Sequence, residues 1–341
     1  MKAPEYFIGI DVASLSFTAT VGKKPWQLFI RPTEFTNDYD SFPKFLHWLQ
    51  QHNLHPDNVV LCTEATGVYG EALAYFVHAN GYRIAVEPPL KVKRAFDTSG
   101  HKSDAVDSRQ IAEYACRYFD ELAFWQPKAD ILEQIKVLLN TREQFSTQLT
   151  AHRNALKALQ RKVVVTPLAE QLHQDNITQL KNHIKSIGEE IRRLIDQDPN
   201  YRQMVSLLMS IPGVGLLLAA QMLVMVENAP KPVSAKSLAA YIGICPYEYL
   251  SGTSVFKRSS SRHYGPAAVR KLLYLAALSL RTHHDQFREY FLRKVAEGKS
   301  KKLVLNNIAN KLLKIMCAVI RTQTPYIPNY RSVNPLLIKT A

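Results

Sequence analysis

The sequence predicts a mixed α/β domain at the N-terminus, followed by a part that is almost entirely helical. Three observations support this division. Up to residue 127, short apolar runs typical of strands alternate with helical patterns. Beyond residue 128, apolar residues recur at intervals of three and four, which is typical of amphipathic helices. The excess of positive charge lies almost wholly in residues 201–341, which carry 20 Lys and Arg against 5 Asp and Glu.

The N-terminal part contains strands and helices in an order that predicts one mixed sheet. The expected strands are 6–10, 14–21, 27–35, 58–62 and 83–87, and the expected helices are 38–51 and 69–80. A sheet of this order gathers the ends of its strands at one rim. Side chains that follow these strands therefore converge there.

Four acidic residues fall where that rim is expected. Asp11 ends the first strand, and Glu64 follows the strand 58–62. Asp104 and Asp107 stand three residues apart at the start of a helical pattern, so their carboxylates lie on one face about one turn apart. Such residues either cap a helix among solvated neighbours or bind a divalent cation. Several carboxylates from separate elements are what Mg²⁺-assisted phosphodiester chemistry requires.

Residues 128–200 predict two long helices that Pro167 separates. The pair is either a helical hairpin that buries its own apolar stripe or a coiled coil that joins protomers. Asp198-Pro199 marks the expected boundary to a C-terminal domain over 201–322, and an extended tail is expected over 323–341.

The C-terminal domain carries two segments that suit a nucleic-acid partner. In SIPGVGLLLAAQML, Gly213 and Gly215 lie between two helices. This is either a helix-hairpin-helix whose backbone N–H groups approach a DNA phosphate or a tight turn within a core. Residues 251–254 predict a small loop before a helix that starts at Pro266. The basic residues after this loop, which are either phosphate contacts or solvated, are Lys257, Arg258 and Arg262.

The composition predicts a globular protein without a disulfide framework or a membrane span. With 46% hydrophobic and 21% charged residues, the chain is globular. Its four cysteines form no CxxC pair, so neither a zinc site nor a disulfide framework is indicated, and a reducing cytoplasm is expected. The N-terminus lacks the layout of a signal peptide. The charge-free segment 206–226 is interrupted by a Pro-Gly turn, so we expect core helices there and no membrane span.

Three segments, IGIDVA, TEATGVYG and HKSDAVDSRQIAEYA, resemble the acidic blocks of the RuvC-like domain in the DEDD transposases. That family also includes pilin-gene invertases, and the resemblance extends along almost the whole chain. It implies an RNase H-like (RuvC-like) fold over residues 1–127. It also implies that Mg²⁺ is held by Asp11, Glu64, Asp104 and Asp107.

The same resemblance implies a serine nucleophile in the C-terminal domain. The family pattern Tyr-x-Ser-Gly-x-Ser is matched by Tyr249 to Ser254, which places the nucleophile on Ser251. Leu250 stands where the family often has Glu, and this departure leaves Ser254 as a second candidate. The resemblance further implies oligomerisation through 128–200 as a homodimer or homotetramer, donor and target double-stranded DNA, and a noncoding guide RNA.

The resulting hypothesis is a DNA transposase or site-specific recombinase that cuts and rejoins DNA through a covalent phosphoserine. The alternative is a hydrolytic RuvC-like nuclease, such as a junction resolvase, in which the acids activate water and Ser251 is only a loop residue. A third hypothesis, a binding protein that has lost its chemistry, is disfavoured by the intact set of acids.

Overall fold

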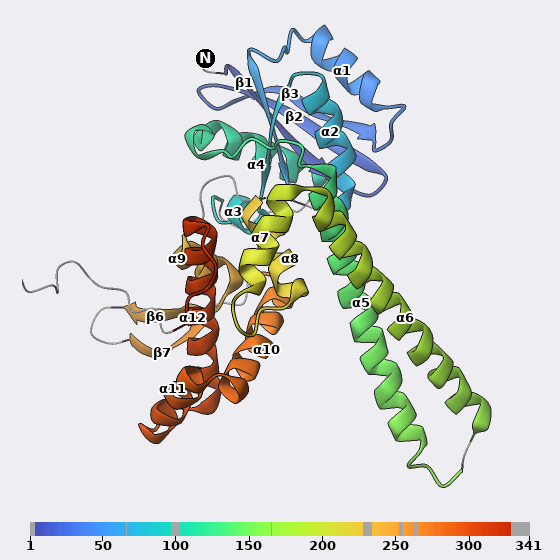
Figure 1. Ribbon diagram of the computed structural model, residues 1–341. Coiled ribbons are helices and arrows are strands. Elements are labelled where there is room, and N and C mark those ends of the chain that lie inside the picture. Colours follow the sequence, from blue (N-terminus) through green and yellow to red (C-terminus); the bar gives the residue numbers. More distant parts are fainter. Residues whose placement is uncertain are drawn as a thin grey trace, which may run out of the picture. The chain divides into compact units, whose positions relative to one another are not determined.

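Five strands in the order β3-β2-β1-β4-β5 form one mixed sheet in the N-terminal part (Figure 1). β1 pairs antiparallel with β2 and parallel with β4, while β5 continues the parallel side. The strands are β1 (Tyr6–Val12), β2 (Ser16–Lys23), β3 (Gln27–Thr36), β4 (Val59–Glu64) and β5 (Arg83–Glu87).

The computed structural model describes residues 4–65, 67–96, 103–164, 166–227, 234–251, 255–261 and 265–328. Of residues 247–251 and 255–260, only the backbone is described. The chain divides into two compact units, residues 1–127 and residues 128–341.

The central strands β1 and β4 are buried on both faces of the sheet, because their residues alternate between two hydrophobic cores. Ile8, Ile10 and Leu61 pack in one core with α1 (Phe42–Gln51) and α2 (Glu71–Ala79). Phe7, Val60 and Cys62 pack in the other with α4 (Asp104–Arg117). The short α3 (Pro89–Lys93) adds Val92 to this second core. The face that α4 covers carries the site described below.

The second unit begins with a long helical hairpin, α5 (Asp130–Leu159) and α6 (Pro167–Gln197), whose helices lie side by side (Figure 1). As expected, Pro167 separates them and stands at the start of α6. Near the base, residues of both helices, such as Ile135 and Ile191, are fully buried in the core of the unit. The hairpin therefore belongs to the same hydrophobic core as the helices that follow it.

Six further helices build the remainder of this core: α7 (Pro199–Met209), α8 (Leu216–Glu227), α9 (Ala235–Ile242), α10 (Ala267–His283), α11 (Asp285–Ala296) and α12 (Lys301–Thr322). The segment 206–226 is divided between α7 and α8, as its Pro-Gly turn predicts. Among the described residues, α12 alone is long and apolar enough to cross a membrane. Eight of its residues are buried in the core, so it packs as a core helix.

The order of a mixed α/β sheet followed by a mostly helical part is confirmed. The two-stranded antiparallel hairpin of β6 (Pro246–Ser251) and β7 (Val255–Ser261) was not predicted. Of the expected loop 251–254, Ser251 belongs to β6, and the other residues lie outside the described part of the chain. Ser251 is thus the last residue of a strand.

Candidate active site

Asp11 and Glu64 occupy adjacent positions on neighbouring parallel strands. The register pairs Ile10 of β1 with Thr63 of β4, and the two acids are the next residues along each strand. Because strand residues alternate between faces, Asp11 shares the face of Phe7, and Glu64 shares the face of Cys62. Both acids therefore lie on the face that α4 covers, and both are partly buried.

The helix α4 approaches this face most closely at Gly9. A Cβ atom at Gly9 would lie 2.1 Å from the carbonyl oxygen of Ser108 and 2.2 Å from the backbone nitrogen of Ala112. A buried hydrogen bond of 2.8 Å between Thr20 Oγ1 and Ser108 Oγ holds the helix against β2. The absence of a side chain at Gly9 thus permits direct contact between helix and strand.

Asp104 and Asp107 lie within one turn of this contact. Ser103 is the N-cap of α4, and its Oγ accepts a hydrogen bond from the backbone N–H of Val106 at 3.4 Å. Asp104 is therefore the first residue of the helix and not its cap. Both acids stand in the first turn, where the helix dipole favours negative charge, with Asp104 exposed and Asp107 partly buried.

The donor chemistry of the four positions suits Mg²⁺, because all four are carboxylates. In the described part of the chain, no three His, Cys, Asp or Glu side chains form a group close enough to hold one ion. Mg²⁺ needs only one or two carboxylates when water and substrate phosphate complete its coordination. Burial raises the pKa of the nearby Cys62 thiol.

A fifth carboxylate borders the site, and sequence reasoning missed it. Glu87 of β5 pairs in register with Glu64, lies on the same face and is 3% exposed. Lys91 of α3 neutralises it, with Nζ 3.1 Å from Glu87 Oε2. Because Glu87 ends a strand and Lys91 lies in the next helix, the helical spacing rule does not apply, and the sequence gives no local signal for this pair.

Ser251 lies in the second unit, at the end of β6, where its backbone pairs with Val255 of β7. Lys257 pairs with Tyr249 across the hairpin, and Arg258 follows in β7. Arg262 and the second candidate nucleophile, Ser254, lie outside the described residues. The backbone thus places Ser251, Lys257 and Arg258 on one hairpin, with Ser251 beside its tip.

The base of the β6–β7 hairpin is anchored by two side chains that sequence reasoning missed. Arg270 of α10 donates from Nη1 to the carbonyl oxygens of Ile242 and Gly265, at 2.8 and 2.7 Å. Asn306 of α12 donates from Nδ2 to the carbonyl oxygen of Ile244 at 2.9 Å. Because these carbonyls flank the hairpin, both side chains fix where it leaves the helical core.

The two glycines between α7 and α8 differ in their surroundings. Gly213 has a φ of +79°, and a Cβ there would lie 3.1 Å from Leu280 Cγ, so this part of the turn packs against α10. A Cβ at Gly215 would meet nothing within 4 Å. Packing within the core therefore explains the glycine at position 213, whereas Gly215 leaves open space beside the start of α8. Phosphate binding by either glycine stays a prediction.

Two transposase families match separate parts of this chain. Residues 8–164 match a family described as "Transposase", of the DEDD type, and this match spans all four acids. Residues 205–292 match the "Transposase IS116/IS110/IS902 family", and this match spans the β6–β7 hairpin.

Individual relatives extend these matches over nearly the whole chain. The "Pilin gene-inverting protein" of Moraxella bovis is 31% identical over 324 residues, which cover 94% of this chain and 97% of that protein. The "Transposase for insertion sequence element IS1111A" of Coxiella burnetii is 24% identical over 256 residues, covering 66% and 68%. These matches define a DNA recombinase. The chain belongs to the IS110 family of DEDD transposases.

Proposed function

We propose that this chain cuts and rejoins double-stranded DNA through a covalent phosphoserine at Ser251, close to Mg²⁺ held by four carboxylates. The observation that carries the proposal is the register of β1 and β4. It puts Asp11 and Glu64 side by side on the face covered by the helix that bears Asp104 and Asp107. The strand order, antiparallel on one side of β1 and parallel on the other, supports an RNase H-like fold.

In the proposed reaction, Ser251 Oγ attacks the phosphorus of a DNA phosphodiester. A Ser–O–P bond forms, the bond from phosphorus to O3′ breaks, and the proton of the serine hydroxyl passes to the departing O3′. The products are a 5′-phosphoserine and a free 3′-hydroxyl. Attack by another strand's 3′-hydroxyl reverses the step, joins new DNA ends and returns the proton to Ser251, so no net cofactor is consumed.

The chain's charged residues stabilise this reaction in two ways. The carboxylates hold Mg²⁺, which supplies positive charge and Lewis acidity at the phosphate when bound. Lys257, Arg258 and Arg262 donate charge-assisted hydrogen bonds to phosphate oxygens. Because serine and carboxylates belong to different units, they meet at the phosphate either within one chain or between protomers.

The proposed partners follow from the family and from one surface feature. Donor and target double-stranded DNA are the substrates, and a noncoding RNA guides their selection in the cytoplasm. The tip of the α5–α6 hairpin exposes several large apolar side chains: Val163 (100% exposed), Val164 (79%), Leu168 (69%) and Leu172 (54%). An apolar group of this kind suits association between protomers, which supports a homodimer or homotetramer.

The test is a covalent trap with labelled DNA in the presence of Mg²⁺, resolved under denaturing conditions. The wild-type chain and Ser254→Ala should form a protein–DNA adduct, whereas Ser251→Ala should form none. Asp11→Asn should also form no adduct while still binding DNA. Cleavage that survives Ser251→Ala would establish the hydrolytic nuclease instead, and no cleavage by the wild-type chain would indicate a binding protein without chemistry.

A further inference from the structure

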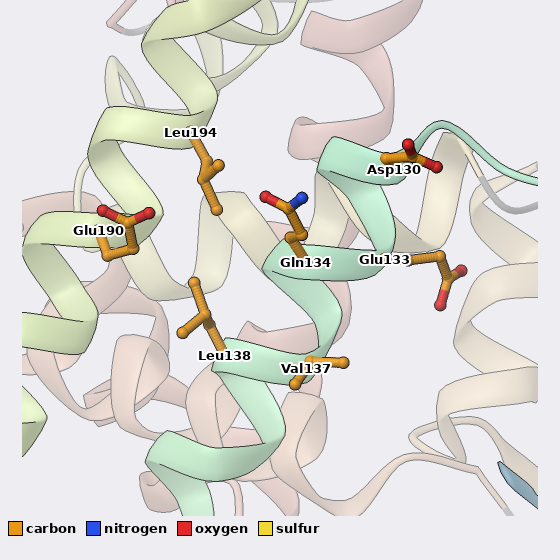
Figure 2. Close-up of a pocket in the computed structure, with 7 residues that line it drawn as sticks. All are labelled: Asp130, Glu133, Gln134, Val137, Leu138, Glu190 and Leu194. Carbon is orange, nitrogen blue, oxygen red and sulfur yellow. The ribbon is translucent and has the colours of Figure 1, made fainter.

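The base of the α5–α6 hairpin carries two hollows of opposite charge. One, shown in Figure 2, is acidic and has a volume of about 540 Å³; Leu138 and Leu194 point into the space between the helices. Its acidic lining residues are Asp130, Glu133 and Glu190. The other, of about 490 Å³, is basic, and its charged lining residues are Arg142, Lys181, Lys185, Glu189 and Arg192. We propose that the basic hollow binds a phosphate group of the backbone of duplex DNA.

The positive charges of the basic hollow are only partly compensated by acidic residues within it. Four cations line it against one acid, Glu189, whose Oε1 lies 3.8 Å from Lys185 Nζ. Arg142, Lys181 and Arg192 form no ion pair within the described part of the chain. Arg142 is partly buried, and this burial lowers the pKa of its guanidinium, although it stays charged at neutral pH. Like charges that line one hollow repel one another, and an anion between them relieves that repulsion.

Two acidic side chains of the acidic hollow form close ion pairs, which the basic hollow lacks among the described residues. Lys136 Nζ lies 2.9 Å from Glu133 Oε2, and Arg193 donates two hydrogen bonds to Glu190, of 2.6 and 2.7 Å. The adjacent residues Arg192 and Arg193 thus have opposite situations on the same helix. Arg193 is satisfied by a neighbouring carboxylate, whereas Arg192 faces the basic hollow.

Gly188 keeps the basic hollow open. It lies in the middle of α6 and lines the hollow, and a Cβ there would meet nothing within 4 Å. A glycine inside a helix costs about 0.5–1 kcal/mol relative to alanine, yet no packing neighbour requires one here. Its effect is to leave room for a ligand between the cationic side chains.

The first residues of α8, Leu216 and Leu217, complete the lining. The first four N–H groups of a helix have no acceptor within the helix and point towards any anion at that end. Gly215, beside them, adds no side chain that would block the approach. Cationic side chains and the first residues of α8 thus line the same hollow, and both kinds of group suit phosphate recognition.

The inference rests on the proposed function, which supplies duplex DNA as the polyanion. It adds a second contact on that DNA, away from the serine hairpin and independent of strand cleavage. The hollow contacts the DNA backbone and not the base edges, so it contributes to affinity and not to sequence specificity.

The test compares two double variants in the full chain by fluorescence anisotropy with duplex DNA across a salt series. Arg142→Gln/Arg192→Gln removes one cation per helix from the basic hollow. Lys136→Gln/Arg193→Gln removes one cation per helix that is already paired. The first variant should bind about tenfold more weakly, with its log–log salt slope smaller by about 1, and the second should match the wild-type chain.

A second variant guards against an indirect effect. Gly188→Glu places a carboxylate in the open floor of the hollow, so it should weaken DNA binding while leaving the unfolding midpoint within experimental error of Gly188→Gln. Equal affinity and salt slope for both double variants would overturn the inference. So would a loss confined to structured RNA, with duplex DNA unaffected. The first double variant could show the smaller salt slope while the wild-type chain forms no phosphoserine adduct. That result would support DNA binding by the hollow and refute the serine chemistry.

Discussion

Gly9→Ala should separate the helix α4 from the sheet and damage the acidic site without touching any acid. The added Cβ would lie 2.1 Å from Ser108 O and 2.2 Å from Ala112 N, where ordinary contact begins at 3.4 Å. Both neighbours are backbone atoms of one helix, so no flexible side chain can yield. The helix must therefore retreat by roughly 1 Å, since carbon contacts are optimal only near 3.5–4 Å.

The cost follows from what this contact holds together. Overpacking a core of this kind costs about 1–3 kcal/mol. Loss of the buried Thr20–Ser108 hydrogen bond would add about 1 kcal/mol. Because Asp104 and Asp107 move with α4, we expect strand cleavage to fall by about 10²-fold, the effect of a 1 Å misplacement at a reacting centre.

Tryptophan fluorescence during urea unfolding is a suitable assay, because Trp26, Trp48 and Trp125 all lie in the first unit. Gly188→Ala is the matched control for stability, and far-UV circular dichroism monitors its unfolding. Its Cβ meets nothing within 4 Å, so alanine should stabilise α6 by about 0.5–1 kcal/mol. A Gly9→Ala variant with unchanged unfolding midpoint and unchanged cleavage would refute the close-contact argument.

Two further variants test contacts that border the proposed chemistry. Lys91→Met leaves the 4%-exposed Glu87 side chain without its partner and should lower the free energy of unfolding by about 1–3 kcal/mol. The double variant Lys91→Met/Glu87→Gln should recover most of this stability in urea unfolding. A Lys91→Met variant as stable as the wild-type chain would show that the ion pair contributes nothing to stability. Arg270→Met releases the carbonyls of Ile242 and Gly265, so adduct formation at Ser251 should fall more than DNA affinity, with Arg270→Lys intermediate. Equal losses of adduct and affinity would indicate a purely structural role for Arg270.

The strands and helices of the first unit could be predicted because their signals are local. Alternating apolar residues and the turns between them define β1 to β5 within a few residues of the expected bounds. The sequence also indicated that Asp11 and Glu64 follow strands. Their common face depends on register, which the alternation of buried residues determines only once the pairing of strands is known.

The contacts that position the site could not be predicted in this way. Gly9 has no local signal as the crossing point of α4, because the contact joins residues about 100 positions apart. The β6–β7 hairpin did carry a signal: the aromatic residues Tyr247 and Tyr249 alternate before the Ser-Gly turn, as in a strand. The Ser-Gly-Thr-Ser composition of 251–254 favoured a loop instead. Arg270 and Asn306 anchor that hairpin from distant helices, so only the tertiary structure reveals them.

The two halves of the proposed site differ in how the fold supports them. The acids lie on strands that are buried on both faces and on a helix that contacts the sheet closely at Gly9 and Thr20. Ser251 ends a strand of a two-stranded sheet, an element that is marginal unless it is supported elsewhere. Within the described part of the chain, its anchoring contacts come from Arg270 and Asn306 at the base. Strand exchange requires the phosphoserine to meet a new 3′-hydroxyl, so a nucleophile on a hairpin anchored only at its base, together with a rigidly held set of carboxylates, suits the proposed reaction.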